Sequence, residues 1–117
     1  MKYDFQKIIA SYPHLIQQID ILRIEVKPQE SHYSLIFLLV QGNKLVMRDY
    51  YFDDGRRKYS FHVQDSANNL IFRYDNEQHW AELPNFPFHK HLPDSVESSP
   101  EMTLEMVFAE LETMLSQ

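Results

Sequence analysis

The chain has 117 residues, a formal net charge of −6 and no cysteine, so disulfides and thiolate metal sites are excluded. Its length predicts a single domain over residues 1–117 that buries a core of its own. The longest apolar run, Leu35–Val40, has six residues, which is too short to span a membrane. Because the N-terminus is polar and does not resemble a signal peptide, we expect a cytoplasmic protein with no membrane partner.

The pattern of apolar and polar residues predicts a short N-terminal helix, about five strands and a C-terminal helix. Residues 3–11 suit the first helix, which Pro13 ends. Alternating side chains predict strands over 16–27, 32–40, 45–53, 56–65 and 70–75. Asp54-Gly55 is a strong signal for a two-residue hairpin turn. The sequence therefore predicts an α+β fold with an antiparallel meander.

The last predicted helix is amphipathic. Ser99 is the expected cap and Pro100 fits the first turn. One apolar stripe contains Leu104, Val107, Phe108, Leu111 and Leu115. We therefore expect this helix to pack on one face of the sheet. After Lys90 the chain has six acidic residues and no basic one, so the exposed side of the helix is a solvated acidic face or meets a basic partner.

The predicted turns set a register that sorts the strand residues onto two faces. The register pairs Phe61 with Arg48, His62 with Met47, His62 with Arg73, and Ser60 with Asp75. The core face would hold Leu35, Phe37, Leu39, Val46, Tyr50, Tyr59, Phe61, Val63, Leu70, Phe72 and Tyr74. The other face would hold Asp49, Ser60, His62, Gln64, Arg73 and Asp75, beside apolar residues that include Met47. Such a cluster suits a concave binding surface, but a solvated sheet face has a similar composition.

Residues 76–93 are predicted to form a loop, because Pro84 and Pro87 interrupt regular structure. We expect the loop to fold back and bring its three histidines towards His62 and Arg73; they are His79, His89 and His91. His89 and His91 would point the same way in an extended segment. The alternative is a surface loop whose aromatic residues cover a sheet edge.

The His89-Lys90-His91 triplet is compatible with three kinds of chemistry. Histidine can transfer protons near neutral pH, and Lys90 with Arg73 can stabilise a phosphate. Neutral imidazoles can also bind a metal. No carboxylate or cysteine stands at a familiar ligand spacing beside these histidines, so we expect no metal and no cofactor.

Several short motifs resemble those of the TumE family of small bacterial toxins. They are Y-S-F-H-V-Q-D at 59–65, R-Y-D-N-E-Q-H at 73–79 and F-P-F-H-K-H at 86–91, within a match that covers roughly residues 30–115. Phe88 and Trp80 replace histidines that are frequent in the family, so the roles of those histidines are not carried over. The closing V-x-P-S segment of the family reads V-E-S-S here, at 96–99.

The resemblance implies the toxin half of a toxin–antitoxin pair, neutralised by a cognate antitoxin protein and acting on RNA or translation. We expect a metal-independent ribonuclease-like protein whose catalytic candidates are His62, Arg73, Asp75, His79, His89, Lys90 and His91. Trp80 or Phe86 would stack on a base, and Asn76 would cap the turn after the last strand. The alternative is a non-catalytic module whose histidine loop and acidic helix contact a protein partner. The sequence is also compatible with a homodimer.

Overall fold

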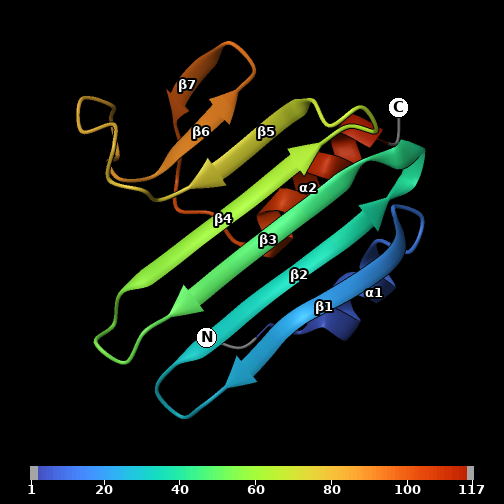
Figure 1. The fold of residues 1–117 in the computed structure, drawn as a ribbon, viewed down its shortest axis with the longest axis horizontal. Helices are drawn as coiled ribbons and strands as arrows, with labels where there is room; N and C mark the ends of the chain where they lie inside the picture. The colour runs from blue at the N-terminus through green and yellow to red at the C-terminus, as the bar shows by residue number, and fades with distance from the viewer. Residues whose placement is uncertain (1–2, 116–117) are drawn as a thin grey trace.

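Seven antiparallel strands, each paired with the next along the chain, form the single sheet of the computed structural model, which describes residues 3–115 (Figure 1). The strands are β1 (Ile16–Val26), β2 (Ser31–Leu39), β3 (Lys44–Tyr51), β4 (Arg57–Gln64), β5 (Leu70–Asp75), β6 (His89–Leu92) and β7 (Ser95–Ser98). A short 3-10 turn, η1 (Val40–Gly42), links β2 to β3. The predicted α+β class and antiparallel meander are confirmed.

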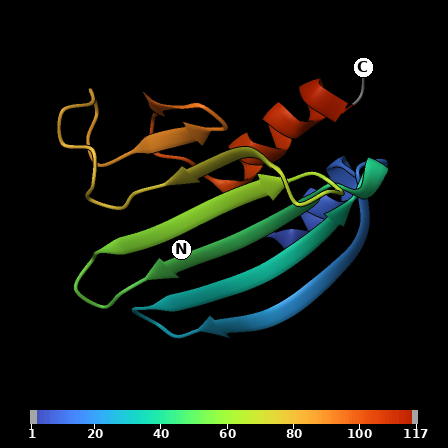
Figure 2. The ribbon, with the colours of Figure 1, turned by 45° about the horizontal axis from the view of Figure 1, so that its top comes forward.

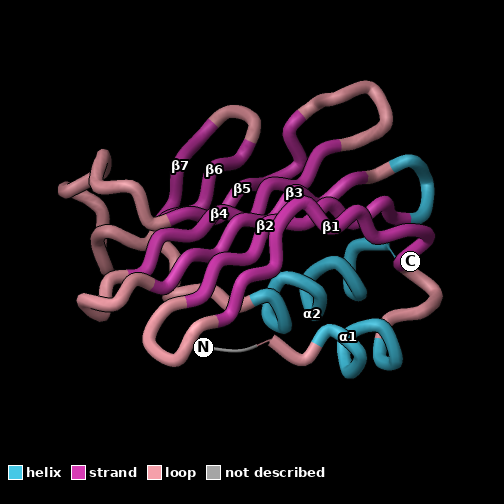
Figure 3. Tube along the Cα trace, turned by 60° about the horizontal axis from the view of Figure 1, so that its bottom comes forward, coloured by secondary structure: helices cyan, strands magenta, loops and turns pink. Residues whose placement is uncertain are grey.

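Both helices lie against the same face of the sheet, which we call the inner face (Figure 3). The first, α1, spans Phe5–Ser11, and the side chain of Asp4 caps it by accepting a hydrogen bond from the amide of Lys7. The second, α2, spans Leu104–Leu115 and lies along this side of the sheet in a second view as well (Figure 2). Neither helix covers the opposite, outer face. Within residues 3–115, no helix has the length and hydrophobicity needed to cross a membrane.

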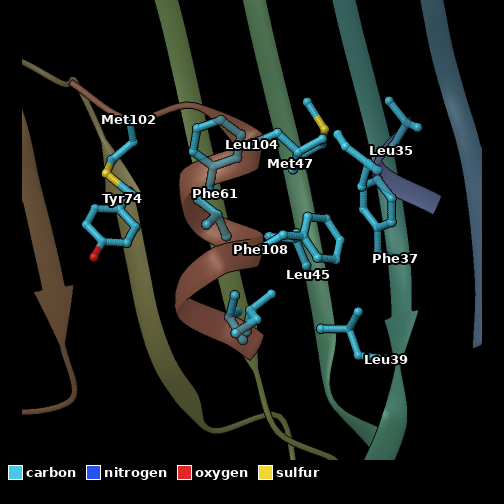
Figure 4. Packing of buried hydrophobic residues seen from close by; sticks show 14 of the residues in the cluster. Leu35, Phe37, Leu39, Leu45, Met47, Phe61, Tyr74, Met102, Leu104 and Phe108 are labelled. Carbon is cyan, nitrogen blue, oxygen red and sulfur yellow. The ribbon is translucent and has the colours of Figure 1, made fainter. Parts of the chain in front are cut away.

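The hydrophobic core fills the space between the inner face and α2 (Figure 4). Buried side chains alternate along the strands, as the two-residue period of a strand requires. Phe108 of α2 is fully buried, with its ring centroid 5.2 Å from that of Phe37 and 5.3 Å from that of Tyr12. The predicted packing of the C-terminal helix on one face of the sheet is thus confirmed.

The predicted count of about five strands is wrong, because two strands arise within and just after the segment predicted as a loop over 76–93. Residues 89–92 form β6, which pairs with β5, and residues 95–98 form β7, which pairs with β6. These short strands are rich in His, Lys and Ser and lack the β-branched and aromatic composition that marks a strand. Pairing with β5 therefore prevails over weak local propensity. The shorter loop 76–88 lies at one end of β5 and β6 (Figure 1).

The hairpin between β3 and β4 has one loop residue more than the predicted Asp54-Gly55 turn. The amide of Gly55 donates to the carbonyl of Phe52, and the amide of Phe52 donates to the carbonyl of Arg56. These bonds close a three-residue loop, in which Gly55 is last and has a φ of +88°. Such loops require a left-handed residue at this place, which favours glycine.

The extra loop residue reverses the predicted faces of β3. Met47 pairs with Phe61, and Val46 pairs with His62, one residue away from the predicted register. Because a shift of one residue exchanges the two faces of a strand, Met47 and Asp49 point to the inner face instead of the outer one. The β4–β5 register has no such error: the predicted pairs of His62 with Arg73 and of Ser60 with Asp75 are confirmed.

Asp49 is consequently buried on the inner face, where Arg57 neutralises it. The Nε and Nη2 atoms of Arg57 donate to the two carboxylate oxygens at 2.8 and 2.7 Å, and the Tyr3 hydroxyl donates to the same carboxylate. The guanidinium also donates to Glu101 at 3.0 Å and lies 4.1 Å from the centroid of the Tyr59 ring. A bidentate pair of this kind satisfies the buried charge on both sides.

The second helix begins later than predicted. It starts at Leu104, and the Thr103 hydroxyl accepts a hydrogen bond from the amide of Met106 at 3.3 Å, which is the capping role predicted for Ser99. The preceding segment stays non-helical, so that Met102 is buried in the core and its amide donates to the hydroxyl of Tyr59. Burial of Met102 explains the delayed start.

Replacing Phe108 by alanine should lower the free energy of unfolding by about 3–5 kcal/mol, because the change leaves a cavity between α2 and β2. Urea unfolding of the purified protein measures the effect. Met106→Ala is the matched control, since this side chain of the same helix is 40% exposed and its loss should cost less than about 1 kcal/mol. Equal losses for the two variants would contradict the packing described for α2.

Candidate functional site

Two adjacent rows of side chains cross the outer face over β3, β4, β5 and β6. The first row consists of Val46, His62, Arg73 and His91, and the second of Arg48, Ser60, Asp75 and His89. Residues directly opposed on neighbouring strands have their Cβ atoms about 4.5–5.5 Å apart on the same face. The register therefore gathers two arginines, three histidines and one aspartate on a single surface.

A cleft of about 770 Å³ opens on this surface. His62, Arg73 and His91 line it from the sheet, and Trp80 and Leu83 line it from loop 76–88. A smaller hollow of about 220 Å³ lies beside it. Its lining includes Arg48 and shares His62 and Arg73 with the cleft, so the two hollows form one continuous groove across the strands.

At one side of the cleft, Asp75, His89 and His91 converge. The Nε2 atom of His89 lies 2.7 Å from Oδ1 of Asp75 and 3.1 Å from Nε2 of His91. The Nε2 atom of His91 lies 3.5 Å from Oδ2 of Asp75. Asp75 and His89 are 3% and 1% exposed, whereas the side chain of His91 is 27% exposed and reaches the cleft. We call these three residues the Asp-His-His cluster.

Neighbouring groups hold this cluster in place. The Nδ1 atom of His89 lies 2.9 Å from the carbonyl oxygen of Pro87, and because a carbonyl can only accept, Nδ1 carries the hydrogen. Asp75 accepts hydrogen bonds from the amide of Glu77 and from Nε of Arg73, both at 3.0 Å. Among residues 3–115, only Nε of the Arg73 guanidinium has a hydrogen-bond partner, and the side chain is 37% exposed and lines the cleft.

His62 is partly buried in the floor that both hollows share. Its Nε2 atom lies 3.1 Å from Oε1 of Gln64, whose own amide nitrogen donates to Asn68. The Nε2 atom of His62 is therefore the donor in that bond, and its buried Nδ1 atom has no partner in the described part of the chain. Burial, and then the positive charge of Arg73, lower the pKa of His62, so the ring is neutral near pH 7.

His91 is also held in its neutral form. Burial lowers its pKa, and the charges of His89 and Arg73 act in the same direction, while Asp75 opposes them. The indole of Trp80 meets the His91 ring edge to face, with centroids 6.3 Å apart. His91 and Trp80 thus give the cleft a neutral imidazole and an aromatic wall.

Lys90 lies on the other side of the sheet from the histidines that flank it in sequence. It pairs with Tyr74 of β5 across the strands, and its Nζ atom donates to Glu110 of α2 at 2.9 Å. The hydroxyl of Tyr74 donates to the same carboxylate, and burial raises the pKa of Tyr74 to about 12. The alternation of a strand, hidden when 76–93 is taken as a loop, separates Lys90 from the candidate site.

His79 is exposed and lines a different hollow, together with Arg57 and Asn76. We expected at least one histidine of the loop to lie near His62. His91 does so, because it lines the cleft with His62, whereas His79 does not line this cleft. Asn76 ties the loop to the sheet, because its side chain accepts from the amide of Tyr59 and donates to the carbonyl of Arg57. These bonds go to β4, so the turn cap expected of Asn76 is made instead by Asp75, which accepts from the amide of Glu77.

Sequence reasoning missed Arg48 as a site residue and the union of Asp75 with two histidines. The predicted register placed the side chain of Arg48 on the core face, yet it is exposed on the outer face and forms no ion pair within residues 3–115. Asp75 is 14 positions before His89 in the sequence, and only the unpredicted pairing of β5 with β6 brings them together. The signal available was Asp75 at a strand end, followed by an extended His-x-His segment.

Comparison with known proteins agrees with the motifs of the β4 and β5 strands and of the loop. A family model described as Toxin TumE matches residues 5–115. A search of the curated proteins and a search of the solved structures found no match. The family match spans both helices, the whole sheet and all residues of the cleft described above. The chain therefore belongs to the TumE toxin family.

Proposed function

We propose that this toxin is neutralised by a cognate antitoxin protein and that it cleaves RNA bound in the outer-face groove. The observation that supports the proposal best is the position of Arg73. Arg73 stands between His62 and His91 in the strand register and lines the groove with them, and Arg48 lines the adjoining hollow. Two guanidinium groups that lack a full set of partners suit successive phosphates of a nucleic acid backbone, because each can bind phosphate through two parallel hydrogen bonds.

The rest of the groove suits a single-stranded base. Trp80 and Leu83 provide an aromatic and apolar wall, and unpaired bases stack on aromatic side chains in most sequence-tolerant RNA sites. The donor Nε2 atom of the neutral His62 ring is close to the path between the two arginines, where it can turn from Gln64 to a sugar or base. The reactive part of the proposed site is the Asp-His-His cluster, which lies beside Arg73.

The alternative function, a non-catalytic binding module, is supported by a different surface. Met106 and Met114 are 40% and 38% exposed on α2, next to Glu105. Exposed methionines on an acidic helix suit a protein partner. However, α2 covers the inner face (Figure 3), whereas the groove is lined by side chains of the outer face. An antitoxin that bound α2 alone would leave the groove open, so contact with α2 and action on RNA are compatible.

Arg73→Gln should reduce RNA cleavage about 100-fold or more, because it removes a charge placed to stabilise the phosphate. The rate is measured with purified protein and a fluorescent single-stranded RNA. Arg56→Ala is the control: it removes the same charge from a side chain that is 75% exposed at the β3–β4 loop and far from the groove. Cleavage that both variants retain equally would exclude the groove as the site.

Expression of the chain in a bacterial host should arrest growth, and co-expression of its neighbouring gene product should restore growth and yield a stable complex. The Arg73→Gln variant, produced at the same soluble level, should not arrest growth, since the groove would no longer hold RNA. Colony counts after induction provide the measurement. Growth arrest by Arg73→Gln equal to that by the wild type would favour the non-catalytic module.

The neutral state of His62 predicts a pH dependence of stability. Its folded pKa is below the unfolded value of about 6.5, so its contribution to stability is complete above that value and is lost as the pH falls through the folded pKa. Arg73 from β5 and Arg48 from β3 line the same hollow, and the charge of Arg73 opposes protonation of His62. His62→Gln should therefore lose less stability than the wild type between pH 7 and pH 5 in urea unfolding. Parallel pH profiles would refute this account of His62.

A further inference from the structure

We propose that the Asp-His-His cluster is a binding site for a divalent transition-metal ion, with Asp75, His89 and His91 as its three protein ligands. The ligand atoms lie within 4.8 Å of one another. Nε2 of His89 is 2.7 Å from Oδ1 of Asp75 and 3.1 Å from Nε2 of His91, and Nε2 of His91 is 3.5 Å from the other carboxylate oxygen, Oδ2. A metal held tetrahedrally at about 2.0–2.1 Å keeps nitrogen and oxygen ligands roughly 3.3 Å apart. The 3.1 and 3.5 Å separations are close to this spacing, and the 2.7 Å contact would lengthen when an ion bound.

The hydrogen bond between His89 and Pro87 fixes which ring nitrogen enters the cluster. Because Nδ1 of His89 donates to the carbonyl of Pro87, Nε2 is the atom that meets Oδ1 of Asp75 at 2.7 Å and Nε2 of His91 at 3.1 Å. A proton on Nε2 can serve one of these neighbours at a time, whereas a metal ion between the three groups would contact all of them.

The groups around the cluster match those that support metal ligands elsewhere. A ligating histidine usually donates its other ring N–H to a carbonyl or carboxylate, as His89 does to Pro87. The ligating carboxylate is usually held by further hydrogen bonds, as Asp75 is by Glu77 and Arg73. Because Asp75 and His89 are buried and rest on paired strands, the ligands are fixed before an ion arrives.

The composition of the ligand set defines the class of ion. Two imidazoles and one carboxylate suit Zn²⁺, Mn²⁺, Fe²⁺ or Co²⁺, while Mg²⁺ prefers oxygen ligands alone. Three protein ligands leave coordination positions for water or a substrate oxygen. Because Asp75 and His89 are buried, water or a substrate oxygen would reach a bound ion from the cleft beside His91 and Arg73.

A bound ion also resolves the charge balance of the cleft. Arg73 is partly neutralised by Asp75, and Glu82 and Asp94 line the same cleft. A polyanion would meet more negative than positive charge here without a further cation. An ion with two positive charges would offset this excess of negative charge and could coordinate a phosphate oxygen beside the guanidinium. This use of the ion rests on the proposed function, whereas the ion site itself rests only on the geometry of the cluster.

The test is titration of the purified full chain, first stripped with EDTA, with ZnCl₂ and separately with MnCl₂ in a calorimeter, together with thermal unfolding. We expect saturable binding of one ion per chain and a higher unfolding temperature with the ion present. His91→Ala should weaken binding at least about 100-fold, since it removes a direct ligand whose partly exposed ring is dispensable for folding. Asp75→Asn is the second variant and should have the same effect, with its folding checked by circular dichroism.

His79→Ala is the matched control, because it removes an exposed imidazole that lies outside the cleft, and it should bind the ion as the wild type does. Co²⁺ added to the wild type should give visible absorption bands that His91→Ala lacks. The absence of saturable binding, or equal binding by wild type and His91→Ala, would overturn the proposal. RNA cleavage that persists in EDTA together with no ion binding would establish metal-free acid–base catalysis instead. Ion binding without any RNA cleavage would keep the metal site and refute the proposed function.

Discussion

The pairing of β6 with β5 is the contact on which the candidate site depends. Three residue pairs define it, and two of them, Arg73 with His91 and Asp75 with His89, place charged and imidazole groups side by side on the outer face. The third, Tyr74 with Lys90, lies on the inner face and joins Glu110 of α2. A shift of one residue would move both histidines to the inner face and Lys90 to the cleft. The inner-face contact with α2 therefore fixes the register that assembles the outer-face cluster.

The inner face carries the core and the outer face carries the candidate site because both helices pack on the inner face. Both helices cover the inner face, so the apolar side chains that β2, β3, β4 and β5 direct to this face are buried there, and the outer face can carry polar groups. Side chains on paired strands have little freedom, which suits groups that must be held within a fraction of an ångström. Most of the groove is built in this way, and loop 76–88 adds Trp80, Glu82 and Leu83. The loop thus supplies one wall, while the sheet supplies the arginines and the histidines.

The sequence was sufficient to predict the fold class and the register between β4 and β5. The alternation in β4 and β5 predicts the pair of His62 with Arg73, and the stripe from Leu104 to Leu115 predicts the packing of α2. The faces of β3 could not be predicted, because the same residues around Gly55 are compatible with a two-residue or a three-residue loop. The first loop places Asp49 on the outer face and the second places it on the inner face. The β6 strand could not be predicted because its stability comes from pairing with β5.

The same limit applies to the chemistry of the site. Spacing along the chain argued against a metal, since no carboxylate stands near His89 and His91 in sequence. That argument considers only one segment, and the carboxylate of Asp75 comes from another strand. A ligand set divided between paired strands leaves no compact motif in the sequence. Only the strand register shows that these ligands lie together. Here that register is the pairing of β6 with β5, and local propensity does not predict β6 as a strand.

The two buried aspartates are neutralised in different ways. Asp49 has both oxygens bound by the guanidinium of Arg57 and a further donor from Tyr3. Asp75 receives one guanidinium nitrogen and one amide, and its remaining contacts are with the imidazoles of His89 at 2.7 Å and His91 at 3.5 Å. An imidazole, unlike a guanidinium, can exchange its proton near neutral pH and can bind a metal ion. A buried aspartate that is matched by such groups at the edge of a cleft is the arrangement expected where a protein binds a ligand or carries out chemistry.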